Sequence, residues 1–139
     1  MPYRVIEPIL TMNEVDSNNR FFTTESIRYM FDKLKQQYSD VPVVSVNAVN
    51  SDSSKFFEMS PLNFCGLAKI TQGSRNDIFA DFNTLTTPAG FELDKLIADS
   101  RSIFYRAAGI CDYETNNEGV LIIKTFELIY VTIHFGKPE

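Results

Sequence analysis

Apolar residues along the chain recur at two spacings, one typical of a helix and one typical of strands. In the segment TTESIRYMFDKLKQQYS they keep the three, four and seven spacing of one helical face: Ile27, Met30, Phe31, Leu34 and Tyr38. Thr23 or Thr24 can cap this segment, and Glu25 lies in the first turn, where the helix dipole favours an acidic residue. The pattern predicts a helix over residues 24 to 37.

A second helix is predicted in the segment TPAGFELDKLIADS. Thr87 is suited to the capping position and Pro88 to the first helical position. The apolar face of this helix would consist of Ala89, Leu93, Leu96 and Ile97.

The remaining apolar segments have the alternation or β-branched content of strands, and polar turns separate them. Pro8 places the first strand at a sheet edge or at a bulge, and the turns GSRND and TNNEG indicate hairpins. Residues 12 to 22 are expected to form a polar, Asn-rich turn, and residues 50 to 61 a surface loop. The strands are expected at residues 4 to 11, 41 to 49, 64 to 72, 77 to 86, 102 to 114 and 119 to 135.

This order of elements predicts a single α+β domain over residues 1–139. Strands outnumber helices, so the most economical packing is a mainly antiparallel, bent β-barrel or sandwich with two or more flanking helices. The chain is 44% hydrophobic and has a net charge of -5, which fits one compact domain and argues against nucleic acid or an anionic membrane as a partner. No apolar run approaches the ~18 residues that span a bilayer.

The sequence contains no pattern typical of a metal or cofactor site, and we expect neither. Cys65 and Cys111 match no metal-ligand spacing, and we interpret both as small core residues in a reducing cytoplasm rather than as a disulfide. The acidic and polar segment NEVDSNN lacks the oxygen spacing of an EF-hand loop, and AGFELDK is not a phosphate-binding loop.

Six segments of the chain, in order, resemble the prohead (capsid maturation) proteases of tailed bacteriophages. The likeness begins with VDSNNRFFTTESIRYMFDKL, an Asn-any-Arg-aromatic turn that leads into a capped helix. It continues through VSVNAVN, CGLAKITQGSRNDIFADF, TTPAGFELDKLIADS, FYRAAGIC and NNEGVLIIKTFEL. The resemblance implies a bent β-barrel surrounded by helices, as in herpesvirus assembly proteases, and an ancestry of serine proteases that cut scaffold and capsid proteins.

The same resemblance implies that the catalytic residues are lost. Where the family has a histidine after asparagine, this chain has Ala48, and the Ser-Ser-Arg of the family falls on Arg106, Ala107 and Ala108. An acidic residue of some members falls near Ile133, beside His134. Acyl transfer by serine needs a hydroxyl and an imidazole base, and alanine supplies neither.

Other residues could in principle take over the chemistry, but ordinary roles are favoured for each of them. His134 is the only histidine and is interpreted as a structural or surface residue rather than a relocated base. Ser45, Ser100 and Ser102 have no histidine nearby in sequence. Arg106 is expected to face solvent or to pair with Asp112 or Glu127, and a structural ion pair is favoured over ligand binding.

We therefore expect a catalytically inactive, prohead-protease-like structural protein of the phage virion that binds or stabilises the capsid and resides in the host cytoplasm during assembly. The expected partners are capsid or scaffold proteins, and self-association stays open. Phe56 and Phe57, in a polar loop, are candidate interface anchors, with burial in the core as the alternative. Two other functions remain open: an active or trapped maturation protease, and a phage protein that binds a host factor.

Overall fold

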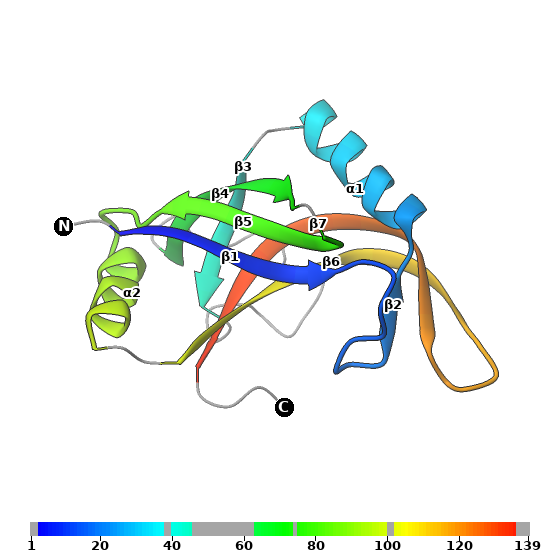
Figure 1. The fold of residues 1–139 in the computed structure, drawn as a ribbon. Coiled ribbons are helices and arrows are strands. Elements are labelled where there is room, and N and C mark those ends of the chain that lie inside the picture. The colour runs from blue at the N-terminus through cyan, green and yellow to red at the C-terminus, as the bar shows by residue number, and fades with distance from the viewer. Residues whose placement is uncertain (1–2, 38–39, 46–62, 74, 100–101, 136–139) are drawn as a thin grey trace.

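The described part of the chain folds into one mixed, curled β-sheet with two helices (Figure 1). The structure is a computed structural model that describes residues 3–37, 40–45, 63–73, 75–99 and 102–135. Its seven strands have the order β1-β5-β4-β3-β7-β2, and β6 also pairs with β7. The elements are β1 (Arg4–Thr11), β2 (Arg20–Phe22), α1 (Thr24–Gln37), β3 (Asp40–Ser45), β4 (Phe64–Gln72), β5 (Asp77–Asn83), α2 (Pro88–Ala98), β6 (Ile103–Thr115) and β7 (Leu121–Phe135).

Strand β7 is paired along both of its edges. On one edge it forms a long antiparallel ladder with β6, from Leu121 to Phe135. On the other edge β2 pairs with its beginning and β3 with its end, both in parallel. The α1 helix connects β2 to β3 and packs on β7. The expected mainly antiparallel sheet is therefore only partly right, because the β2-α1-β3 crossover returns the chain in its original direction.

The other half of the sheet is an antiparallel run of β3, β4, β5 and β1. The sheet curls until β1 contacts β6 (Figure 1), yet no ladder joins these two strands in the described part of the chain. The result is an open half-barrel rather than a closed barrel or a sandwich. Pro8 lies in β1, an edge strand with a register shift between Pro8 and Leu10, as its presence in the sequence predicted.

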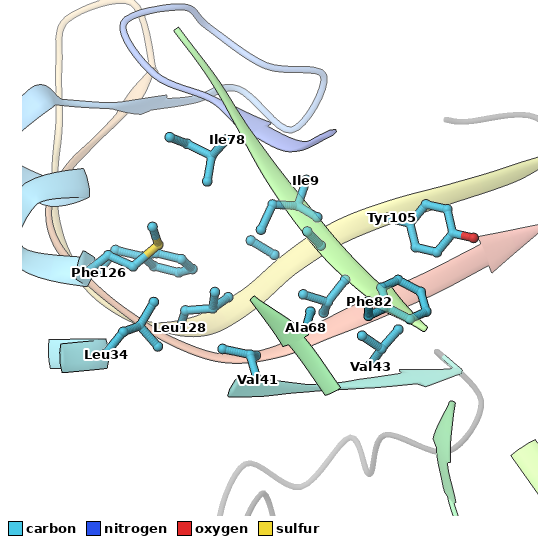
Figure 2. Packing of buried hydrophobic residues seen from close by; sticks show 14 of the residues in the cluster. Ile9, Leu34, Val41, Val43, Ala68, Ile78, Phe82, Tyr105, Phe126 and Leu128 are labelled. Carbon is cyan, nitrogen blue, oxygen red and sulfur yellow. The ribbon is translucent and has the colours of Figure 1, made fainter. Parts of the chain in front are cut away.

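The concave face of the half-barrel encloses the hydrophobic core (Figure 2). Side chains from β1, β3, β4, β5, β6 and β7 meet there, and Figure 2 labels Ile9, Val41, Ala68, Phe82 and Tyr105 among them. Helix α1 closes one end of this core with the buried residues Ile27, Met30 and Leu34, three of the apolar positions that predicted the helix.

Two bulges keep the apolar residues of β7 pointing into the core along the whole strand. Ile129 and Lys124 are extra residues opposite the β6 steps Ala108–Gly109 and Asp112–Tyr113. Each extra residue reverses the alternation of inward and outward side chains. The inward residues are consequently Leu121 and Ile123, then Phe126 and Leu128, then Val131 and Ile133.

Local predictions for the helices and for the hairpin tip are confirmed. Thr23 caps α1 by accepting a hydrogen bond from the Ser26 amide (3.0 Å), and Thr87 caps α2 in the same way through the Gly90 amide (2.9 Å). The NNEG segment forms the turn between β6 and β7, with Gly119 at a φ of 79°. Both cysteines are free, although Cys111 is only partly buried.

Two expectations about strands need correction. The segment expected to be entirely turn contains the short strand β2, because three residues are enough to extend the edge of β7 when β7 is already ordered by β6. The strand expected at residues 41 to 49 begins earlier, at Asp40, and is described to Ser45. The remainder of that segment lies outside the described residues, as does the loop at residues 50 to 61.

The first bulge places a specific demand on Gly109. A β-carbon at this position would overlap the backbone carbonyl of Glu127. We expect Gly109→Ala to lower the free energy of unfolding by roughly 2 kcal/mol or more, because backbone must shift to accept the methyl group. Ala108→Gly is the matched control and should cost less than about 1 kcal/mol. Equal stability of the two variants in chemical denaturation would contradict this account of the bulge.

Candidate functional site

The positions that the resemblance assigns to catalysis lie on β6, beside β7 and β3. Arg106 is opposite Thr132 of β7, which in turn is opposite Val44 of β3. Ala107 is opposite Val131 in the next row. Ala48, Ser100, Phe56 and Phe57 lie outside the described residues, so the structure brings together only the β6 part of the predicted site.

Successive residues of β6 point to opposite faces of the sheet, and this separates Ala107 from Arg106. Ala107 faces the core and is buried among apolar residues. Arg106 lies on the outward face and is partly buried. Its backbone carbonyl accepts a hydrogen bond from the Thr132 hydroxyl at 3.3 Å.

The only imidazole of the chain lies on this same outward face. His134 is two residues after Thr132 in β7, and its Nε2 is 2.9 Å from the Thr132 Oγ1. Burial lowers the pKa of His134 below its ordinary value of 6.5, and the Arg106 cation lowers it further. The neutral imidazole is therefore favoured, and the hydroxyl and the ring hold one another in place.

Ser45, Cys65 and Ser102 carry other hydroxyl and thiol groups in the described structure. Ser45 lies at the end of β3, facing a pocket of about 400 Å³ that also contains Cys65, Leu93 and Ile133. Burial, helped by the nearby Glu92 carboxylate, raises the pKa of the Cys65 thiol to about 11, so the nucleophilic thiolate is disfavoured. Ser102 is exposed just before β6.

Arg106 contributes to a pocket of about 270 Å³ at the opening of the half-barrel. Its walls are β1 from Pro8 to Thr11, the loop from Glu14 to Asn18, and Tyr105 and Arg106 of β6. Asp16 in this loop is already paired with Arg20 at 3.1 Å. Asp112, one of the two partners that the sequence suggested for Arg106, accepts a hydrogen bond from the Thr125 hydroxyl at 3.0 Å.

No group of three or more histidine, cysteine or acidic side chains in the described ranges is arranged to hold a metal ion. In those ranges there is also no helix long and apolar enough to cross a membrane.

A solved structure has a similar fold. It is the bacteriophage T4 capsid assembly protease, gp21, which superposes with a TM-score of 0.74 over 96% of this chain and 81% of that chain. The fold is capsid assembly protease-like. The sequences are 15% identical, so the likeness establishes the fold alone. Comparison with protein-family models and with curated proteins found no match.

The resemblance read from the sequence is supported at the level of fold by the T4 protease. Sequence reasoning did not identify Thr132 as the partner of His134. The signal was present, because residues two apart in a strand lie on the same face, and YVTIHF places a hydroxyl two residues before the imidazole. The pocket beside Arg106 had no sequence signal, because it depends on the curl that brings β1 to β6.

The environment of His134 predicts a pH dependence of stability near neutrality. The unfolded chain takes up a proton near pH 6.5, whereas the folded protein resists protonation to lower pH. The contribution of the neutral imidazole to stability is therefore fully present above pH 6.5, and it decreases as the pH falls from 6.5 towards the lowered pKa of the folded protein. His134→Gln should flatten this part of the curve of unfolding free energy against pH, and an unchanged slope would contradict the assignment.

Proposed function

We propose that this protein is a catalytically inactive relative of the phage capsid assembly proteases that binds to or stabilises the capsid. It acts in the host cytoplasm during assembly and is carried into the virion. The partners are capsid or scaffold proteins of the phage. The observation that supports this most directly is the residue run Arg106, Ala107 and Ala108 on the strand where the resemblance expects a serine nucleophile.

Loss of catalysis follows from what acyl transfer requires. The nucleophile must be an accessible hydroxyl or thiol, with a base in hydrogen-bond reach to remove its proton. Ala107 has no hydroxyl and faces the core, while the sequence match puts Ala48 in place of the base. Two such absences cost orders of magnitude in rate.

A relocated active site is the strongest competing proposal, and the Thr132–His134 pair is the observation that favours it. The separation of 2.9 Å is suitable for proton transfer. Thr132 is only 6% exposed, however, and its hydroxyl is also 3.3 Å from the Arg106 carbonyl. A substrate carbonyl has little access to this oxygen, so we interpret the pair as structural.

Binding to the capsid is inferred from the fold that the protein shares with the T4 enzyme. That enzyme is a capsid assembly protease. A fold that has lost its chemistry keeps the surfaces by which it approached its substrates, and function then depends on those surfaces. Binding of a host factor has no comparable support.

The absence of protease chemistry can be tested directly. We expect the purified protein to leave scaffold and capsid proteins of its phage uncut and to remain unlabelled by a fluorophosphonate probe. Labelling that disappears in Thr132→Val or His134→Gln would establish the relocated site and overturn the proposal. A serine-dependent label would overturn it equally.

Capsid association needs its own measurement. We expect the protein to sediment with purified capsid shells and to be recovered from virions by mass spectrometry. Failure to associate with shells, together with absence from virions, would contradict a capsid role and favour a host-directed one. Phe56→Ala with Phe57→Ala then distinguishes interface from core: reduced association at unchanged melting temperature indicates that the rings belong to the interface.

A further inference from the structure

The far half of the long β6–β7 hairpin exposes a strand edge that has no partner in the described structure. Among the described residues β6 forms a ladder with β7 alone, so its outer edge offers backbone donors and acceptors. Strand β1 contacts β6 where the half-barrel opens, beside Tyr105 and Arg106. The free part is therefore the segment from Gly109 to Thr115, here called the distal half of β6, which projects from the barrel in Figure 1.

Two large apolar side chains of the distal half are exposed, although core residues of β7 lie close to them. Ile110 is 52% exposed on the outward face and Tyr113 is 55% exposed on the inward face, whereas Ile123, the partner of Tyr113, is only 1% exposed. Apolar contact surface is thus available on both sides of the free edge.

The edge lacks two of the features by which proteins often prevent strand addition, a proline or lysine in the strand and a bulge in its own backbone. Between Ile103 and Thr115 the sequence contains no proline and no lysine. Both bulges place their extra residue in β7, so the β6 backbone continues without an inserted residue. Seven residues of continuous strand offer an edge of about 24 Å to an incoming segment.

The charge of this region selects the kind of segment that can be added. From Gly109 to Glu127 the acidic residues are Asp112, Glu114, Glu118 and Glu127, and the single basic residue is Lys124. Asp112 and Glu114 lie on the distal half itself, and both are exposed. The Glu114 carboxylate lies 3.5 Å from the Lys124 ammonium, and the Asp112 carboxylate accepts a hydrogen bond from the Thr125 hydroxyl, so an incoming cation would add to these exposed contacts or replace them. A strand carrying lysine or arginine would meet opposite charge there.

A second copy of this chain is a poorer occupant. Antiparallel pairing of two distal halves would place Asp112 and Glu114 of one copy beside the same acidic residues of the other. Like charges across a strand pair are destabilising.

We propose that the distal half of β6 accepts an extended, basic segment of a partner protein as an added antiparallel or parallel strand. Main-chain hydrogen bonds to the free edge hold the segment, Ile110 and Tyr113 contact its apolar side chains, and Asp112 and Glu114 pair with its lysine or arginine residues. That the segment belongs to a capsid or scaffold protein rests on the proposed function. Binding of a basic strand at this edge does not depend on the proposed function.

The experiment uses the full chain and short capped peptides of alternating Val and Lys. Binding is measured by fluorescence anisotropy, and the contact region is located by hydrogen exchange. We expect the Val–Lys peptide to bind and to protect amides of residues 109 to 115, and a Val–Glu peptide or a Val–Lys peptide with a central proline to bind far more weakly. Protection confined to another region, or equal binding of the Val–Glu peptide, would overturn the proposal.

Charge reversal provides the matched test on the protein. Asp112→Lys with Glu114→Lys should weaken binding of the Val–Lys peptide by about tenfold at low salt, since two attractive contacts become repulsive. Glu92→Lys with Asp99→Lys changes the net charge equally on α2, at the opposite side of the molecule (Figure 1), and should leave binding nearly unchanged. Equal loss in both double variants would reduce the effect to net charge and overturn the proposal.

The outcomes separate this inference from the capsid role. If the peptide binds at the distal half but the protein does not associate with capsid shells, strand addition is supported and the proposed function is contradicted. If the Asp112 and Glu114 variant still associates with capsid shells and no peptide binds, the proposal of strand addition is contradicted and the capsid role is not. Concentration-dependent protection of residues 109 to 115 without any peptide would identify a second copy as the occupant and overturn the proposal.

Discussion

The double pairing of β7 is the interaction on which the rest of the structure depends. One edge holds β6 along its whole length, and the other holds β2 and β3 at its two ends. Helix α1 packs against the same strand while it carries the chain from β2 to β3. Because β3 begins the antiparallel run that ends in β1, the second half of the sheet is also attached through β7.

Bulges make this double pairing compatible with a curved sheet. Unbroken alternation from Leu121 would turn Phe126 and Leu128 away from the core. Because the extra residues Lys124 and Ile129 each reverse the alternation, Phe126, Leu128 and Val131 all point into the core. The curvature in turn brings β1 to β6 and forms the pocket beside Arg106.

Local signals in the sequence predicted the elements well, and features that depend on tertiary pairing escaped them. The caps Thr23 and Thr87 and the turn before Gly119 involve neighbours in sequence, so residue type alone indicates them. Strand β2 exists only because β7 offers an edge, and the half-barrel depends on bulges that simple alternation does not reveal. The positions matched to the Ser-Ser-Arg of the family lie on β6, and the pairing of Thr132 with His134 was not identified from the sequence.

The position of β7 in the sequence also has a consequence for how the protein is made. All of its partners precede it, and β2 lies about 100 residues before the segment it pairs with, as the separation between Thr23 and Ile123 indicates. During synthesis the earlier strands emerge without the strand that joins them, and their apolar faces stay unpaired until translation reaches β7. Contacts this distant close slowly because loop entropy opposes them. Nascent chains that lack β7 are therefore expected to be the species most in need of chaperones, and truncation within this strand would leave the two halves of the sheet without a common support.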